Sequence, residues 1–182
     1  KGVYMTSYAA ASTEILDRLI GLADRTEINA FVIDVKDDLG IVAYDADVEF
    51  AKQEGLIEKR IKDIDALIAK LQEHDITPIA RVVCFKDDTL ATKRPDLAVM
   101  HKGGDIWQDF KGLSFTNPYN REVWEYLVQV AEDAARHGFR EIQFDYVRFP
   151  SDGKISEAVY PGQNSSKEDA IAAFLAYARP RL

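Results

Sequence analysis

Residues 30–36, Ala30-Phe31-Val32-Ile33-Asp34-Val35-Lys36, decide the class of fold. Aromatic and β-branched side chains fill this stretch, which predicts a β-strand. Three further runs of the chain have the same character. They are Val3–Thr6, Thr77–Phe85 and Glu141–Pro150. The chain therefore contains four predicted strands.

An amphipathic helical pattern follows each of the four predicted strands. The patterns cover about Ser12–Arg25, about Glu58–His74, Asn117–Gly138 and Ser165–Pro180. We expect Asn117 to cap the third of these helices, because an asparagine followed by proline is typical of a helix start. Ser165 and Glu168 predict a capping box at the start of the fourth helix.

Strands that alternate with helices predict a parallel sheet covered by helices. Two α/β architectures have this order, an open doubly wound sheet and part of a (β/α)8 barrel. The turn after the first strand, Thr6–Ala11, lacks glycine, which weighs against a nucleotide-binding doubly wound sheet. No repeat or domain boundary interrupts the pattern, so we expect residues 1–182 to form a single domain.

The pattern of the stretch Lys86–Thr116 predicts one long irregular loop, and such loops are usually functional or disordered.

Composition limits the class of protein. Of the 182 residues, 47% are hydrophobic and 30% are charged, as in folded globular domains. No run approaches the roughly 18 apolar residues that indicate a membrane-spanning helix. The net charge of −8 argues against a nucleic acid as partner.

The single cysteine, Cys84, excludes an internal disulfide, and its apolar neighbours predict a packed thiol rather than a nucleophile.

Polar side chains interrupt three of the predicted strands near their carboxyl ends, although parallel strands are usually apolar throughout. They are Asp34, Lys36, Arg81, Gln143 and Asp145. Because side chains alternate along a strand, Asp34 should share a face with Lys36, and Gln143 with Asp145. Buried charges need partners, so we expect one polar cluster at the carboxyl-end mouth of the sheet. Barrel enzymes place their active sites there, whereas a purely structural ion-pair network is the alternative.

Asp145 is the strongest candidate for chemistry in this cluster. It lies between Phe144 and Tyr146 at the end of a predicted strand, so its carboxylate should point at the mouth. Arg81 or Lys36 nearby would hold this carboxylate ionised. An ionised aspartate in such a position suits a nucleophile that attacks the anomeric carbon of a sugar.

Other residues near the predicted mouth are candidates for substrate binding. Tyr146 and Arg148 follow Asp145 directly, and Arg148 could orient a substrate or pair with an acid. Trp107, in the long loop, is a candidate platform for a sugar ring, although it could instead fasten the loop to the rim. The three histidines lack metal-ligand spacing, and the acids Asp37-Asp38 match no calcium loop, so we expect no metal and no cofactor.

Several of these segments together resemble a known family. They are Lys1–Thr6, Asn29–Asp38 (NAFVIDVKDD), Pro78–Phe85 (PIARVVCF), Asn117–Asn120 with Val123-Trp124, and Gln143–Pro150 (QFDYVRFP). The chain resembles a bacterial family of TIM-barrel domains that was once described as a domain of unknown function. That family is assigned to the glycoside hydrolases and is distantly related to the α-amylase and α-galactosidase superfamily.

The resemblance implies a (β/α)8 barrel, of which this chain supplies roughly the first four β/α units. It implies a carbohydrate substrate, a glycosidase reaction, and an extracellular or cell-envelope location. In the barrel relatives the nucleophile is an aspartate after strand four, which corresponds to Asp145. Their general acid comes from a later strand, so we expect these 182 residues alone to be inactive. Asp34 is the nearest substitute for that acid within the chain.

Two functions remain open at this point. One is a glycoside hydrolase that acts through Asp145, with Asp34, Lys36, Arg81 and Gln143 around its substrate. The other is a non-catalytic carbohydrate-binding or scaffold domain that keeps the barrel without the reaction. A half barrel would also expose its first and fourth strands as open edges, which predicts self-association.

Overall fold

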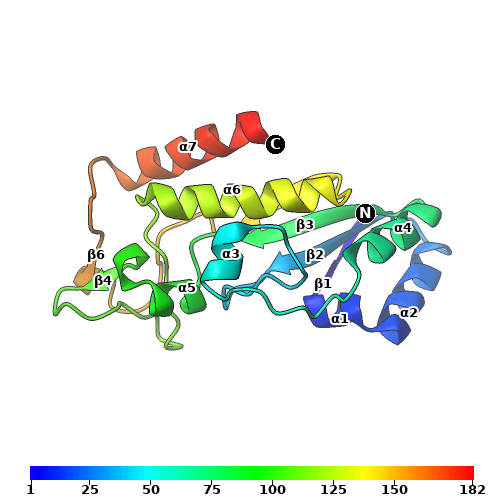
Figure 1. Ribbon diagram of the computed structural model, residues 1–182, viewed down its shortest axis with the longest axis horizontal. Coiled ribbons are helices and arrows are strands. Elements are labelled where there is room, and N and C mark those ends of the chain that lie inside the picture. The colour runs from blue at the N-terminus through cyan, green and yellow to red at the C-terminus, as the bar shows by residue number, and fades with distance from the viewer.

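Four parallel strands form the main sheet of the computed structural model, which describes residues 1–182 (Figure 1). They are β1 Gly2–Met5, β2 Ala30–Lys36, β3 Thr77–Val83 and β5 Glu141–Asp145. Their order in the sheet, β1-β2-β3-β5, follows the chain without reversal. A doubly wound sheet reverses its strand order, whereas a barrel adds each strand beside the one before. The predicted α/β fold of the TIM-barrel type is therefore confirmed.

Seven α-helices connect or follow these strands. They are α1 Ser7–Ala11, α2 Thr13–Ala23, α3 Glu49–Gln53, α4 Ile64–Glu73, α5 Asp88–Lys93, α6 Arg121–Arg136 and α7 Lys167–Ala178. Short 3-10 helices cover Pro95–Leu97, Ile155–Glu157 and Arg179–Arg181. A small antiparallel sheet pairs β4 Met100–His101 with β6 Ala158–Val159. None of the helices combines the length and apolar character needed to cross a bilayer.

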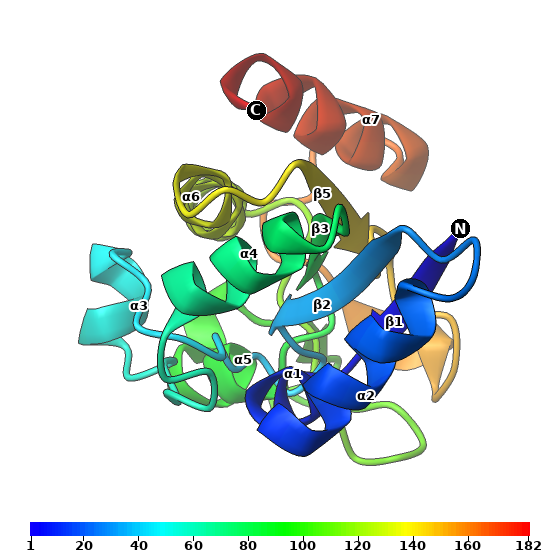
Figure 2. The same ribbon diagram turned by 90° about the vertical axis from the view of Figure 1, so that its right-hand side faces the viewer.

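The two faces of the main sheet have different environments. Phe31, Ile33 and Val35 of β2 are fully buried in the main core with residues of the covering helices. Figure 2 shows α4 and α6 along this side of the sheet. On the other face, Gly2 and Gln143 are exposed and the Tyr4 side of β1 is open, with Tyr4 53% exposed. One sheet face thus builds the core, while the other faces solvent.

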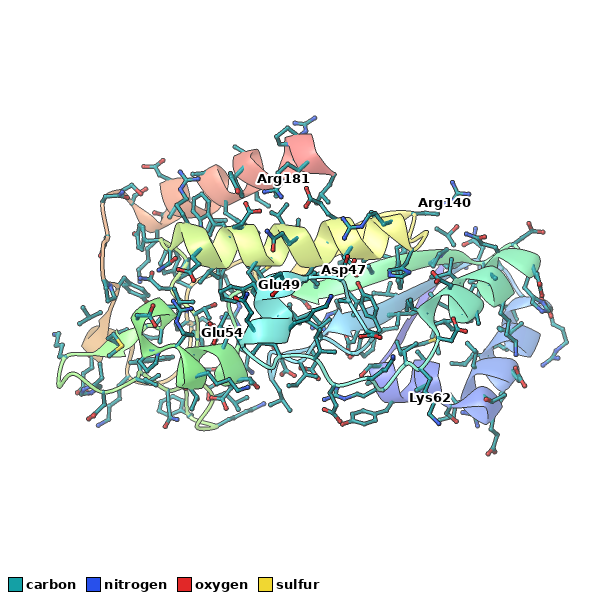
Figure 3. The ribbon with its side chains drawn as sticks, viewed as in Figure 1. Asp47, Glu49, Glu54, Lys62, Arg140 and Arg181 are labelled. Carbon is teal, nitrogen blue, oxygen red and sulfur yellow. The ribbon has the colours of Figure 1, made fainter.

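Helix α7 closes the fold over α6 and the last strand. Phe174 of α7 packs its ring against Phe85, Phe144 and Trp124, with ring centroids 5.2, 5.5 and 5.8 Å away. Beyond the helix, Arg181 bonds to Glu125 and Glu132 of α6 (Figure 3). An apolar contact near the middle and an ionic contact at the end therefore hold the two helices together.

One predicted helix begins later than its apolar pattern suggests. The pattern predicts a helix from about Glu58, but α4 starts at Ile64, with the Asp63 side chain accepting a hydrogen bond from the Ala66 amide at 2.9 Å. Ile61 is buried as predicted, yet it reaches the core from a loop whose backbone bonds to Ala43. The expected start was wrong because a buried loop residue continued the helical spacing.

Two predicted helix caps are also wrong, each by a few residues. Asn120, not Asn117, caps α6, and its side chain accepts a hydrogen bond from the Glu122 amide at 2.8 Å. The side-chain amide of Asn117 instead donates a hydrogen bond to the Pro161 carbonyl at 2.8 Å, and this bond joins two loops. Ser166, not Ser165, caps α7 through the Asp169 amide. In both cases two nearby residues of the same type had the right chemistry, and tertiary contacts determined which one caps the helix.

The long loop Lys86–Thr116 is structured rather than irregular. It contains α5, a 3-10 helix and β4. Isolated bridges pair the loop with itself, and β4 pairs with the later strand β6. A second, smaller core of six buried residues holds it to the last loop of the chain. These residues are Val99, Trp107, Phe115, Phe149, Tyr160 and Ala170. Figure 1 shows this part of the molecule beyond the carboxyl ends of the main strands.

Candidate active site

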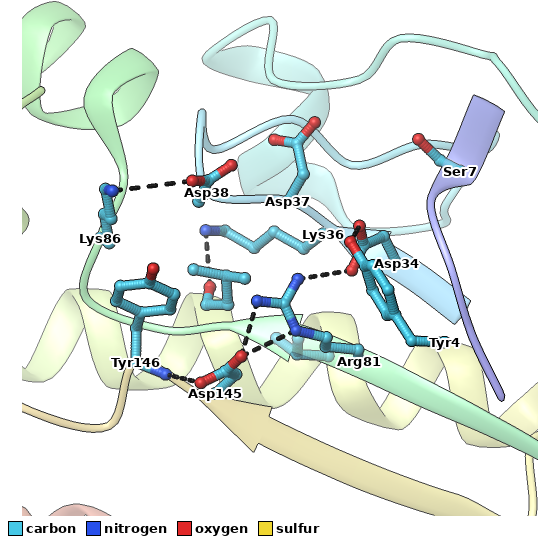
Figure 4. A network of polar contacts seen from close by, with 12 residues as sticks. Tyr4, Ser7, Asp34, Lys36, Asp37, Asp38, Arg81, Lys86, Asp145 and Tyr146 are labelled. Carbon is cyan, nitrogen blue, oxygen red and sulfur yellow. Dashed lines mark hydrogen bonds and ion pairs between the residues drawn. The ribbon is translucent and has the colours of Figure 1, made fainter. Parts of the chain in front are cut away.

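A single guanidinium joins two carboxylates at the carboxyl ends of the strands (Figure 4). Arg81 of β3 donates from Nη1 to Asp34 Oδ1 at 2.6 Å, and from Nε and Nη2 to Asp145 Oδ2 at 2.8 and 2.6 Å. The Asp34 and Arg81 side chains are 6% and 14% exposed, whereas Asp145 is 38% exposed. The expected convergence of three strands on one cluster is therefore confirmed, and Asp145 is its accessible member.

Strand register explains why these three side chains meet. Asp34 of β2 lies opposite Arg81 of β3, and Val83, two residues further along β3, lies opposite Asp145 of β5. Side chains two residues apart share a face, so Arg81 lies between its two acidic neighbours on the open face of the sheet. Although burial opposes its charge, the hydrogen bonds that Arg81 donates to both carboxylates hold its pKa above the ordinary value.

Tyr4 of β1 completes the chain of contacts on the Asp34 side. Its hydroxyl donates to Asp34 Oδ2 at 2.6 Å, so both oxygens of Asp34 are bound. Burial and this hydrogen bond raise the pKa of Tyr4 to about 12. Sequence reasoning missed Tyr4, although its alternation with Met5, a core residue, already placed it on the face that bears Asp34.

Tyr146 has a strained backbone next to Asp145. Its φ is 50°, a left-handed conformation that costs a residue other than glycine about 1–3 kcal/mol. In this conformation the Tyr146 amide donates to Asp145 Oδ1 at 2.7 Å. The Tyr146 ring lies within 5.2 Å of Lys86 Nζ and 4.9 Å of the Arg148 guanidinium carbon. Backbone strain thus coincides with the orientation of the candidate nucleophile.

Lys36 does not join the Arg81 cluster. The register shifts between Asp34 and Lys36, which breaks the alternation that predicted a shared face. Lys36 is fully buried, pairs with Asp87 at 2.8 Å and donates to the Val83 carbonyl at 2.9 Å. The expectation that Lys36 lies beside Asp34 and Asp145 was wrong, and its visible role is to brace the loop after β3 against β2.

Trp107 is buried and offers no platform to a ligand. Its ring lies in the smaller core with Phe115, at a centroid distance of 6.0 Å, and its Nε1 donates to the Lys154 carbonyl at 3.0 Å. The Trp107 ring also lies so close to Gly153 that a Cβ there would be 2.8 Å from it. The sugar-platform expectation was wrong, and the alternative, that Trp107 fastens the loop, describes its contacts.

Gln143 and Arg148 remain accessible near the cluster. Gln143 lies opposite Arg81 in the sheet and, with Tyr4 and Val32, lines an open cavity of about 480 Å³ on the exposed face. Arg148 donates to the Phe149 carbonyl and to the Ser151 hydroxyl and pairs with no acid. Two roles were considered for Arg148, and the structure does not show the one in which it pairs with an acid.

The loop after β2 brings a further carboxylate to the rim, and the loop after β3 brings a lysine. Lys86 Nζ is 3.6 Å from Asp38 Oδ2 and 3.8 Å from Asp109 Oδ2, and Asp38 is 46% exposed (Figure 4). Asp37 is bound instead by Arg60 at 2.6 Å. Sequence reasoning considered both aspartates only as calcium ligands and rejected that role. Their position directly after β2 was the signal, because the carboxyl ends of parallel strands share one rim.

No group of three or more histidine, cysteine, aspartate or glutamate side chains could hold a metal ion. Cys84 is buried, and burial raises the pKa of its thiol well above the ordinary value. The prediction of a packed, unreactive thiol agrees with this placement. The polar groups drawn at the rim in Figure 4 include carboxylates, Arg81, Lys86 and tyrosine hydroxyls.

A family model described as "Putative glycosyl hydrolase domain" matches residues 2–182. The chain belongs to this family. The resemblance inferred from the VIDVKDD and QFDYVRFP segments is thereby confirmed. No curated protein matches the chain.

Solved structures similar to this glycosyl hydrolase domain fall into two groups. A hypothetical protein from Ruminiclostridium thermocellum ATCC 27405 is 38% identical, with a TM-score of 0.92, and the match covers 99% of this chain and 92% of that one. An α-galactosidase from Thermus thermophilus is 18% identical with a TM-score of 0.61, covering 98% of this chain and 35% of the enzyme. A GH20 exo-β-N-acetylglucosaminidase from Vibrio harveyi is 17% identical with a TM-score of 0.63, covering 99% and 33%.

The two enzymes share the fold of the glycosyl hydrolase domain, and at such low identity they indicate no more than the fold. The chain spans about a third of the length of each enzyme. Its four parallel strands thus correspond to part of a TIM-barrel glycosidase fold.

Proposed function

We propose that this domain takes part in the hydrolysis of a glycosidic bond in an oligo- or polysaccharide, with Asp145 as the nucleophile. The observation that carries the proposal is the guanidinium of Arg81 between Asp34 and Asp145. The guanidinium holds the Asp145 carboxylate in a fixed position at the end of β5, where a carboxylate can act as a nucleophile. Its 38% exposed side chain remains accessible to a sugar, whereas Asp34 is buried.

Asp34 acts as a positioning residue in this proposal. Both of its oxygens are bound, by Tyr4 and by Arg81, and its side chain is 6% exposed. It therefore fixes the guanidinium rather than donating a proton to a leaving group. The earlier idea that Asp34 substitutes for the missing general acid is not part of the proposal.

The general acid is proposed to come from a later strand of a longer protein. Glycosidases need two carboxyl groups on opposite sides of the scissile bond. Residues 1–182 alone should accordingly bind saccharide without cleaving it. Asp38 is the other exposed carboxylate on this rim and is the alternative candidate for the acid. We further propose an extracellular or cell-envelope location, which rests on the family resemblance and is tested by cell fractionation.

The test compares Asp145→Asn, Asp38→Asn and Asp152→Asn in the longest native protein that contains this domain. Asp152 is an exposed loop aspartate and serves as the matched control. We expect Asp145→Asn to lower kcat by about a thousandfold or more, while Asp152→Asn leaves it unchanged. A fluorinated glycoside should label Asp145 covalently, which mass spectrometry of peptides detects. Full activity of Asp145→Asn would refute the nucleophile assignment.

The second candidate function is non-catalytic carbohydrate binding. It is favoured by the three hydrogen bonds that already occupy Asp145, two from Arg81 and one from Tyr146. In that case the longer protein binds saccharide, cleaves none, and Asp145→Asn changes affinity alone. The same set of variants therefore separates the two functions.

A further inference from the structure

A second cavity lies outside the Arg81 cluster, between the amino-terminal ends of α6 and α7. These two ends lie side by side in Figure 1. The cavity measures about 270 Å³ and shares no lining residue with the cluster. It is slightly smaller than the roughly 300–1,000 Å³ typical of pockets for drug-sized ligands, which suits a single sugar ring.

The cavity has an apolar floor and a polar rim. Trp124 and Ala170, which are buried, and the small side chain of Ala173 provide the floor. Tyr119 forms one wall, and its position is fixed because its hydroxyl donates to the Ser165 carbonyl at 2.9 Å. An apolar surface beside fixed polar groups matches a sugar ring, which has apolar C–H faces and a belt of hydroxyls.

The two charged side chains of the rim, Arg121 and Asp169, form no ion pair within the protein. Arg121 stacks its guanidinium on the Trp124 ring, 3.9 Å from the centroid, and forms no ion pair. Asp169 contributes its backbone amide to the Ser166 cap, while its carboxylate accepts no hydrogen bond from the protein. Arg121 offers donors and Asp169 offers acceptors, which is the complement of a pair of adjacent hydroxyls.

A cavity between α2 and α4 lacks this property. It measures about 360 Å³, and two of its three cations are already paired. Arg60 binds Asp37 at 2.6 Å, and Lys70 binds Asp17. Of these two cavities, only the one at α6 and α7 combines an apolar floor with a guanidinium and a carboxylate that lack partners.

Charge decides the class of ligand. The positive charge of Arg121 is balanced by Asp169 on the same rim, and Glu168 lies close enough to affect Tyr119. An anion would meet these two carboxylates, and a cation would meet Arg121. We propose that this cavity is a second saccharide-binding site, specific for a neutral sugar ring with adjacent hydroxyls and independent of Asp145.

The test is an NMR titration of the isotope-labelled domain with glucose, galactose and N-acetylglucosamine. We expect at least one sugar to cause saturable shifts of the Tyr119, Ala170 and Ala173 amides. Arg121→Ala should weaken this binding by about tenfold or more, and so should Ala173→Leu, which fills the cavity without touching a polar group. Arg18→Ala, which removes an exposed helical arginine of α2, is the matched control and should have no effect.

Asp145→Asn should leave the same shifts unchanged, so failure of the proposed reaction would not affect this result. Absence of saturable shifts with all three sugars would overturn the proposal, as would wild-type affinity in a folded Arg121→Ala variant. Melting curves of Arg121→Ala and Ala173→Leu establish that each variant is folded. Equal saturable shifts with inorganic phosphate would mean an anion site and would also overturn it.

Discussion

Arg81 is the residue on which the candidate active site depends. Its guanidinium is 14% exposed and neutralises Asp34, which is 6% exposed, as well as Asp145. A buried carboxylate that loses its cationic partner retains the full cost of desolvation. The cluster is therefore both a stability element and the arrangement that orients Asp145, and substitutions in it should affect stability as well as function.

Arg81→Met is expected to destabilise the domain by about 3–5 kcal/mol, because it leaves Asp34 charged, buried and bound only by Tyr4. Urea denaturation at neutral pH measures this free energy. Adding Asp34→Leu to Arg81→Met should recover much of the loss, since it removes the unpaired charge. A loss below about 1 kcal/mol in the single variant would mean that the pair is solvated and contradict the burial argument.

Tyr4 predicts a stability change at high pH. Its pKa rises from an ordinary 10.0 to about 12, because burial and the hydrogen bond to Asp34 favour the neutral phenol. A group with a raised folded-state pKa stabilises the fold below its unfolded pKa, and this contribution is lost as pH rises through the folded value. The stability difference between wild type and Tyr4→Phe should thus be constant below about pH 10 and shrink between about pH 10 and 12.

Denaturation curves of wild type and Tyr4→Phe at several pH values measure this difference. Tyr8→Phe is the matched control, because Tyr8 is exposed and lies near the end of β1. A stability difference for Tyr4→Phe that does not vary across this range would show that the Asp34 hydrogen bond does not hold the phenol neutral.

At the scale of elements, the start of α7 shows how tertiary contacts select one of two residues that have the same local preference for capping a helix. Ser165 and Ser166 have the same side chain. The Ser166 hydroxyl accepts a hydrogen bond from the Asp169 backbone amide at 3.0 Å, whereas the Ser165 hydroxyl donates one to a backbone carbonyl. Ser166→Ala should therefore cost about 1 kcal/mol of stability, the usual value for a lost N-cap, and Ser165→Ala close to nothing.

Thermal or urea unfolding of the two serine variants provides the measurement, with each variant acting as the control for the other. A larger loss for Ser165→Ala would place the start of α7 one residue earlier. The capping box read from Ser165 and Glu168 would then be the correct assignment.

At the scale of the whole molecule, the main sheet has two open edges and an open face. β1 and β5 each pair with one neighbouring strand only. Tyr4 of β1 and Gln143 of β5 are exposed on the open face of the sheet. Unpaired strand edges and exposed sheet faces favour association with other chains. A second copy, or later strands of a longer protein, would cover the same surface.

Residues 1–182 alone are expected to self-associate through this face in a concentration-dependent way. Val32→Lys, which places a charge on the open face beside Tyr4, should shift the population toward monomer. Leu22→Lys, on the outer surface of α2, should not. Light scattering across a concentration series measures the effect. A monomer at every concentration, with a sharp melting transition, would contradict the prediction.

The sequence by itself determined the architecture and three members of the polar cluster, Asp34, Arg81 and Asp145. Four strand runs and their helices specify a parallel sheet, because the periods of apolar residues are local properties. β2 was predicted with its observed bounds, Ala30–Lys36. Asp34, Arg81 and Asp145 were identifiable because charged residues in parallel strands must find partners.

Only the tertiary structure decided which of these polar residues meet and which are covered. The register shift after Asp34 turns Lys36 away to Asp87, and the smaller core buries Trp107. The helix caps at Asn120 and Ser166 likewise depend on how neighbouring loops bond. Register, burial and competition between equivalent donors arise from contacts far apart in the chain, which no local pattern of residues encodes.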